Sequence, residues 1–129
     1  MFSDRDGRYL RTFQRQAAHA HDHCTFLAAR LGPLRGWLSA GGRGLSERAD
    51  HIRRHFEDIE ASYQRVTREA ERPPPDDRRS RRDQRRELRR IVDEMSRKVD
   101  ELDSLVLGLE VEHRVQSGRS DRRPPEAGG

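Results

Sequence analysis

Several residue types are scarce in this chain, and each scarcity removes a class of protein. One of the 129 residues is a cysteine, Cys24, so neither an internal disulfide nor a zinc site built from cysteines can form. Aromatic residues make up 5% of the chain, and none follows Tyr63. No apolar run approaches the roughly 18 residues of a membrane span, and the charged start MFSDRDGRYL does not resemble a signal peptide. We therefore expect a cytoplasmic protein without a membrane span.

Apolar residues are also few, at 31% of the chain, whereas charged residues reach 39%. Ordinary globular domains contain about 45–50% apolar and about 25% charged residues. Only a narrow core is possible, and long amphipathic helices suit such a composition. Of the 27 basic residues all but Lys98 are arginine. Arginine binds phosphates and carboxylates through paired hydrogen bonds, although a GC-rich coding sequence produces the same bias.

Apolar residues recur in three stretches with alternating steps of three and four, the repeat of helices that pack along a narrow seam. The first seam comprises Leu10, Phe13, Ala17, Ala20, Cys24, Leu27, Leu31, Leu34 and Leu38. The second comprises Leu45, Ala49, Ile52, Phe56, Ile59, Tyr63, Val66 and Ala70. The third comprises Leu88, Val92, Met95, Val99, Leu102, Val106 and Leu109. These seams predict helices over about residues 8–38, 46–71 and 78–116.

Glycine and proline separate the three stretches. The run SAGGRG (39–44) predicts a flexible break, after which Ser46 is a candidate N-cap. Three consecutive prolines in ERPPPDD (71–77) end the second helix. Gly32 and Pro33 leave open whether the first helix ends or kinks there.

The fold class predicted from these patterns is all-α: a three-helix antiparallel bundle, or a helical hairpin, with a long coiled-coil third helix. Short linkers favour antiparallel neighbours. Charge agrees, since residues 57–71 carry a net charge of −3 and residues 72–90 carry +5. Residues 1–116 should form one helical domain, and residues 117–129, which have no periodicity, a disordered C-terminal tail. Ser3 with Asp6 has the spacing of a capping box for the first helix, and Asp77 or Ser80 would cap the third.

The third helix is the longest and should outreach its neighbours by several turns. An apolar surface that overruns its own bundle needs another partner. We therefore expect a non-enzymatic assembly or adaptor protein that self-associates or binds a protein partner through the far end of this helix. The residues expected to bind are Leu102, Leu105, Val106, Leu107, Leu109 and Val111.

The sequence contains no recognisable catalytic arrangement. A glycine-rich phosphate loop and a G-x-S-x-G elbow are both absent. Neighbouring acidic residues fall mostly off the seams, where they act as solvated salt-bridging groups. We expect neither an enzyme nor a cofactor nor a small-molecule substrate.

The run RRSRRDQRRELRR (78–90) raises an alternative function, that of a nucleic-acid-binding accessory protein. Contacts to phosphates dominate nucleic-acid affinity, and arginine supplies them. The other interpretation is a solvated helix flank that sets bundle pairing. The arginines concerned are Arg78, Arg79, Arg81, Arg82, Arg85, Arg86, Arg89 and Arg90.

Two histidine pairs with i, i+4 spacing raise a lesser alternative, a metal-binding bundle. His19 and His23 share one helix face, as do His51 and His55, and such pairs can bind first-row metals. Together the pairs would make a four-ligand site. The seams place these histidines beside the core and not inside it, so no metal is expected.

Overall fold

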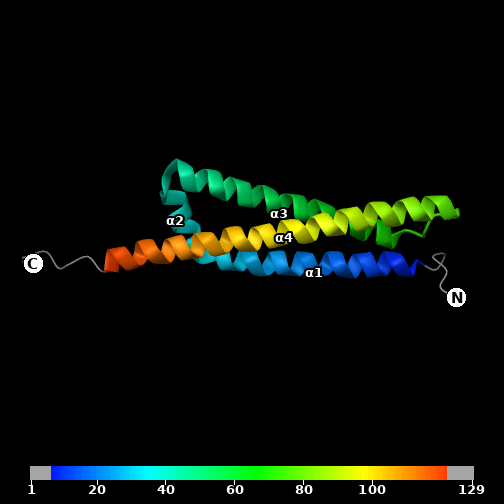
Figure 1. Ribbon diagram of the computed structural model, residues 1–129, viewed down its shortest axis with the longest axis horizontal. Coiled ribbons are helices and arrows are strands. Elements are labelled where there is room, and N and C mark those ends of the chain that lie inside the picture. Colours follow the sequence, from blue (N-terminus) through cyan, green and yellow to red (C-terminus); the bar gives the residue numbers. More distant parts are fainter. Residues whose placement is uncertain (1–6, 122–129) are drawn as a thin grey trace, which may run out of the picture.

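Figure 1 shows the computed structural model of the chain, which describes residues 7–121 and the side chains as far as Gly118. Three long helices lie side by side: α1 (Arg8–Leu31), α3 (Gly42–Glu71) and α4 (Arg78–Asp121). α1 and α4 run in one direction and α3 runs against both, which confirms the predicted all-α antiparallel bundle. Among the described helices none has the length and apolarity to cross a bilayer.

The connection between α1 and α3 settles the question raised by Gly32 and Pro33. α1 ends at Leu31 and a 3-10 turn, η2 (Gly32–Leu34), follows it. A short helix, α2 (Arg35–Ala40), then crosses from the end of α1 to the start of α3 (Figure 1). A proline inside a helix removes a backbone hydrogen bond and clashes with the preceding turn. The continuous helix expected over 8–38 is therefore wrong.

Two adjacent glycines let the chain reverse between α2 and α3. Gly42 has a φ of 81°, in the left-handed region that favours glycine. A Cβ atom on Gly41 would lie 2.0 Å from Cδ1 of Leu45. α3 begins at Gly42, four residues before the expected start, so Ser46 lies inside the helix and is not its N-cap. The flexible break expected over 39–44 is reduced to a bend at Gly41.

α4 begins where Asp77 caps it, because Oδ2 of Asp77 accepts a hydrogen bond of 2.9 Å from the amide of Ser80. This contact with Ser80 lowers the pKa of the Asp77 carboxyl group below its usual value. The helix continues to Asp121, so the first five residues of the tail expected over 117–129 are helical. Residues 122–129, and the Ser3–Asp6 cap, lie outside the described residues. With 44 residues α4 is about 66 Å long, longer than α1 with 24 residues or α3 with 30.

The three predicted seams form the core. All seven residues of the third seam are buried, and the first two seams supply most of the remaining buried side chains. Tyr9 and Ile91 also belong to the core although they lie off the seams. Leu102 is completely buried, and the burial of such a side chain stabilises the fold by about 1.5–3 kcal/mol.

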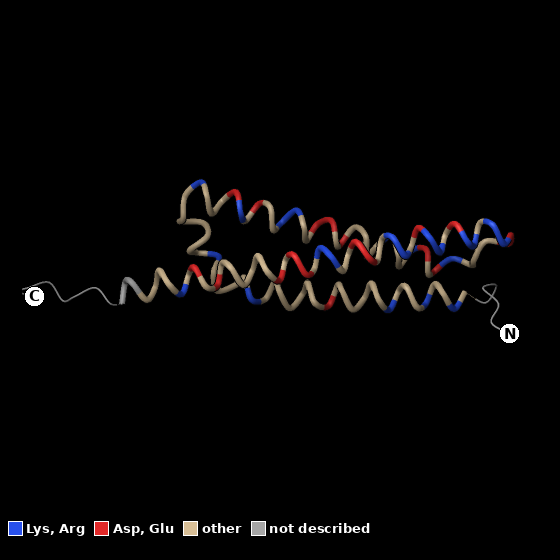
Figure 2. Tube along the Cα trace, viewed as in Figure 1, with Lys and Arg blue, Asp and Glu red and all other residues tan. Residues whose placement is uncertain are grey.

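Ion pairs between helices join basic residues of α1 and α3 to acidic residues of α4 at one end of the bundle, and follow the expected pattern only partly at the other. Figure 2 shows how the charged residues are distributed along the helices. Arg48 of α3 pairs with Glu112 of α4, and Arg30 of α1 pairs with Glu110. At the opposite end the acidic part of α3 was expected to face the arginine-rich start of α4. There, Arg65 on α3 and Glu87 on α4, 3.3 Å apart, pair in the reverse sense. Asp58 on α3 and Lys98 on α4, 3.0 Å apart, pair in the expected sense.

Candidate functional site

The partner surface predicted on α4 is divided between the core and the outside of the bundle. Leu102 and Val106 are completely buried and Leu109 is 1% exposed, so these three are not accessible to a partner in this structure. Leu105 is half-buried and packs against the core. The accessible part of the predicted surface is Leu107 with Val111.

Leu107 and Val111 continue into a third exposed residue that the sequence analysis did not include. Leu107 is 53% exposed, Val111 46% and Val115 48%. Their spacing of four places them on one helix face. Val111 follows Leu102 by nine residues, which at 3.6 residues per turn is roughly half a rotation, so this face lies opposite the core.

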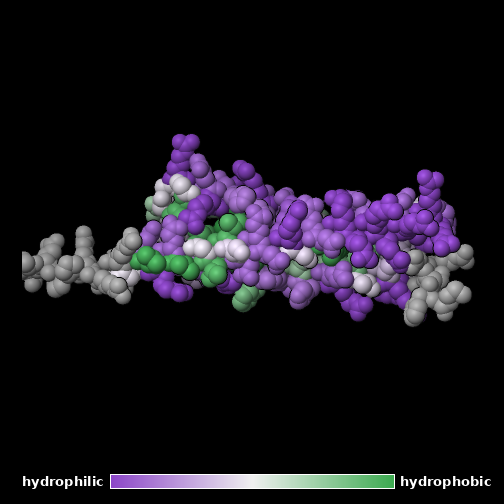
Figure 3. All heavy atoms as spheres, in the orientation of Figure 1, coloured by the Kyte–Doolittle hydropathy of each residue, from purple (hydrophilic) through white to green (hydrophobic). Residues whose placement is uncertain are grey.

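Small residues flank these three side chains. Ser104 and Gly108 are exposed, and no atom lies within 4 Å of a Cβ built on Gly108 or Gly118. We call this set of residues the outer stripe; its members are uncharged, and the exposed Arg114 borders it, three residues after Val111. Its members are Ser104, Leu107, Gly108, Val111, Val115 and Gly118. Figure 3 shows hydrophobic atoms gathered over the C-terminal part of α4.

The C-terminal end of α4 extends beyond α1, α2 and α3, as the sequence predicted (Figure 1), and α2 contacts part of the helix before this end. Nε1 of Trp37 on α2 donates a 2.9 Å hydrogen bond to Oε1 of Gln116, and the Trp37 ring packs edge-on against His113. The side chain of Trp37 therefore reaches α4 as far along as Gln116. The apolar surface is a lateral face of the bundle.

The eight arginines of residues 78–90 divide into three groups, of which the first is a single buried residue. Arg81 is 7% exposed, and its Nη1 donates hydrogen bonds of 2.9 Å and 2.5 Å to the carbonyl oxygens of Pro75 and Asp76. Arg81 thus fastens the proline-rich loop onto the start of α4. It is not available to a phosphate, contrary to the expectation for a nucleic-acid contact.

Three further arginines make contacts on the bundle surface. Arg90 pairs with Glu87 at 2.6 Å and with Glu94 at 3.5 Å. The guanidinium groups of Arg85 and Arg89 lie over aromatic rings of α1, at 5.0 Å from the centroid of Tyr9 and 5.7 Å from that of Phe13. Such contacts use the face of the guanidinium and leave its N–H groups at the edge.

The last four arginines, Arg78, Arg79, Arg82 and Arg86, are exposed and pair with no carboxylate of the described residues. At about 100° per residue their positions fall within roughly 100° of helix surface. Because α1 and α4 are parallel, basic residues of α1 lie at the same end of the bundle (Figure 2). This group is a cationic face, and we call it the arginine face.

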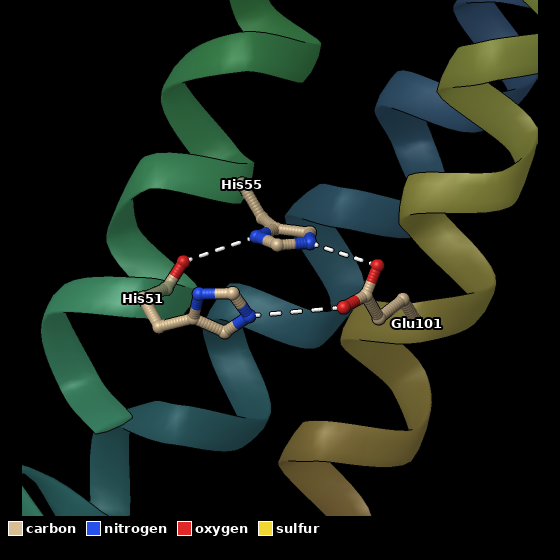
Figure 4. Close-up of side chains that lie close together, drawn as sticks. All are labelled: His51, His55 and Glu101. Carbon is tan, nitrogen blue, oxygen red and sulfur yellow. Dashed lines mark hydrogen bonds and ion pairs between the residues drawn. The ribbon is translucent and has the colours of Figure 1, made fainter. Parts of the chain in front are cut away.

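The two histidine pairs are not brought together in the described part of the chain. His19 is exposed in a groove between α1 and α4, and Nε2 of His23 lies 3.8 Å from Asp103. His51 and His55 instead meet a carboxylate of α4, that of Glu101 (Figure 4). The four-ligand site considered from the sequence does not form.

No pattern in the sequence predicted that Glu101 lies next to the histidines. Its position opposite His51 and His55 depends on the register between α3 and α4, which the heptads of single helices do not determine. His55 first, and then His51, lower the pKa of the Glu101 carboxyl group below its usual value. Glu101 is therefore a carboxylate at neutral pH.

Cys24 lies on the core side of α1 and is 6% exposed. Burial, with a smaller contribution from the charge of Glu60, raises the pKa of the Cys24 thiol to about 11. The group is a thiol and not a thiolate at neutral pH, which fits the small core residue indicated by its seam position.

No protein-family model, curated protein or solved structure shows a significant similarity to this chain. Functional inference therefore begins with the surfaces described above.

Proposed function

We propose that this chain is a non-enzymatic assembly protein that self-associates through the outer stripe of α4. The observation that carries the proposal is an apolar, uncharged face, with Leu107, Val111 and Val115 each about half exposed, on the side of α4 opposite the core. Exposed apolar side chains that line up along a helix are typical of surfaces that bind another helix. Glycine and serine beside them allow a second helix to approach closely.

The pattern of the outer stripe indicates that the partner is a second copy in antiparallel orientation. Leu107 and Val115 lie four residues on either side of Val111, and Ser104 and Gly118 lie seven residues on either side. About a two-fold axis at Val111, leucine thus matches valine and serine matches glycine, whereas Gly108 is matched with Arg114. Closed dimers bring one surface patch of each copy against the same patch of the other, and this requires such self-complementarity.

Introducing a charge at the centre of the proposed interface is the direct test. Sedimentation equilibrium over a range from low to several hundred micromolar should show a reversible dimer of the wild-type protein. Val111→Asp should be monomeric at every concentration, because two carboxylates would meet on the axis. Circular dichroism should show unchanged helicity, since Val111 contributes nothing to the core.

Phe26 provides the matched control. It is 61% exposed on α1, away from the outer stripe, so Phe26→Asp removes a comparable exposed apolar group and should leave the dimer intact. A wild-type protein that stays monomeric throughout, or equal loss of dimer in both variants, would refute the proposal.

Cysteine cross-linking tests the orientation. In the antiparallel dimer, Val111→Cys should oxidise to a disulfide-linked dimer on its own. Leu107→Cys should cross-link chiefly to Val115→Cys when the two variants are mixed. A parallel dimer would instead link each variant to itself. The buried Cys24 should not interfere.

A second function, binding of a nucleic acid, is favoured by one specific observation: Arg78, Arg79, Arg82 and Arg86 form a face without carboxylate partners among the described residues. Contacts of arginine with phosphates would give an affinity that falls steeply with salt concentration. This surface lies at the other end of α4 from the outer stripe, so both functions are compatible in one molecule.

The test is binding of a labelled duplex at several salt concentrations. Arg82→Glu with Arg86→Glu should weaken binding and reduce the salt dependence by about two counterions. Arg53→Glu, which changes an exposed arginine of α3 already paired with Asp50 and Glu57, is the control. Binding that is absent, or that is lost equally in the control, would remove this function.

A further inference from the structure

His51 and His55 of α3 and Glu101 of α4 direct three potential metal ligands at one point (Figure 4). The ligand atoms all lie within 4.8 Å of one another. Nε2 of His55 lies 3.1 Å from one carboxylate oxygen of Glu101, and Nε2 of His51 lies 3.7 Å from the other. Both rings therefore present the same nitrogen to the same carboxylate.

A hydrogen bond to the backbone fixes which nitrogen of His55 can bind a metal. Nδ1 of His55 lies 3.1 Å from the carbonyl oxygen of His51. A carbonyl oxygen only accepts hydrogen bonds, so Nδ1 carries the proton and donates it. In neutral His55 the lone pair is then on Nε2, the atom that faces Glu101. Histidines that bind metals are typically oriented by such a hydrogen bond from the other ring nitrogen.

Nε2 of His55 and one oxygen of Glu101, 3.1 Å apart, are held together either by a proton on Nε2 or, if the ring is neutral, by a cation between the two lone pairs. The distance of 3.7 Å between His51 and Glu101 is too long for a hydrogen bond, so a proton does not account for that contact. Tetrahedral zinc, with bonds of about 2.0–2.1 Å, separates its ligand atoms by roughly 3.3 Å. The two observed distances go to different oxygens of Glu101, and the three ligand atoms, one from each residue, lie within 4.8 Å of one another, so the side chains would have to draw together around a tetrahedral ion.

We propose that His51, His55 and Glu101 bind a divalent first-row metal ion, with zinc as the ion that their chemistry fits. Two imidazoles and one carboxylate are a donor set of zinc sites that keep a fourth position open. Histidine binds a metal through a neutral ring, and with both rings in that form the three ligands would carry a net charge of −1, which favours a cation. The inference goes beyond the proposed function and does not depend on it.

The ion would join two helices, because α3 supplies two ligands and α4 the third. His51 also lines a groove of about 200 Å³ between these helices, with Glu47 and Arg48 on the same wall. This groove borders the cluster on the His51 side. His55 is only 12% exposed in its side chain, whereas His51 and Glu101 are about half exposed, so the ion can enter from the His51 side.

Zinc titration of the metal-free full-length protein tests the site. Isothermal titration calorimetry near pH 7.5 should give one zinc ion per chain. Zinc at one hundred times its dissociation constant should raise the melting temperature by on the order of 10 °C, and a chelator should reverse the rise. Absence of binding at zinc concentrations of hundreds of micromolar would overturn the proposal and leave a hydrogen-bonded histidine–glutamate cluster.

Variants distinguish zinc binding at a three-ligand centre from nonspecific zinc binding to surface histidines. Glu101→Gln and His51→Ala remove one ligand each at exposed positions, and either should weaken zinc binding at least about tenfold, since losing even an outer-shell partner typically costs that much. His19→Ala with His23→Ala removes the pair of equal spacing on α1 and should leave binding unchanged. Affinity that survives Glu101→Gln, or falls equally in the α1 variant, contradicts the site. Circular dichroism of each variant shows that the bundle remains folded.

Discussion

Arg81 and Arg82 are neighbours in the sequence, yet the structure assigns them opposite roles, and exchanging each for alanine tests that assignment. Arg81→Ala should destabilise the bundle by about 2 kcal/mol. Each of its two hydrogen bonds to loop carbonyls involves a charged donor and contributes about 1.5–3 kcal/mol. Two effects reduce their sum. Water can reach the carbonyl of Asp76 once the side chain is gone, and the buried Nε of Arg81, which has no partner, is removed with it.

Urea unfolding followed by circular dichroism measures the difference. Arg82 is exposed and forms no ion pair with the described residues, so Arg82→Ala should change the free energy of unfolding by less than about 0.5 kcal/mol. In the duplex-binding assay, Arg82→Ala should lower the affinity for the duplex more than Arg81→Ala does. Equal destabilisation by the two variants, or a larger loss of duplex binding for Arg81→Ala, would refute the assignment.

Three further outcomes follow from the core, the thiol and one ion pair. Leu102→Ala should cost about 2–5 kcal/mol of unfolding free energy in urea titrations, whereas Leu107→Ala should cost less than about 0.5 kcal/mol in the monomer. Cys24 should react with a thiol reagent near pH 8 only as fast as the bundle opens, because its pKa of about 11 keeps it protonated, and comparable rates in native and urea-unfolded protein would contradict this. The hydrogen bond from Arg30 lowers the pKa of the Glu110 carboxyl group. The stabilisation from this pair is therefore complete above the unfolded-state pKa and is lost as pH falls through the lower folded-state pKa. Unfolding measurements at decreasing pH should show a smaller loss of stability for Glu110→Gln than for the wild-type protein.

The heptad pattern predicted the core because a seam is a property of one helix at a time. Leu88, Met95 and Leu102 are buried by their spacing alone, whichever neighbour covers them. The same pattern could not locate the helix ends between residues 31 and 42. Leu34 and Leu38 keep the step of three and four, but Pro33 interrupts the backbone, and η2 and α2 carry both residues on a new axis.

The functional surfaces were predictable to the extent that they belong to a single helix. Leu107 and Val111 were recognised as lying off the third seam, and Val115 follows them with the same spacing. Which of the arginines are buried could not be predicted, because Arg81 is buried through contacts with a loop whose path depends on Pro73, Pro74 and Pro75. Glu101 depends on the register between two helices, which is set by packing along their whole length.

The outer stripe lies near one end of α4 and the arginine face near the other, and this separation has a consequence for a dimer. Arg82 and Val111 are 29 residues apart, or about 44 Å along the helix. A two-fold axis at Val111 would therefore hold two arginine faces about 87 Å apart at opposite ends of a rod. A single bundle carries the arginine face at one end only, whereas the dimeric rod carries one at each end and is bivalent. Such a rod would gain avidity only from anionic sites whose spacing matches the distance between its two arginine faces. Dimerisation would therefore determine which spacing of anionic sites the protein binds most tightly.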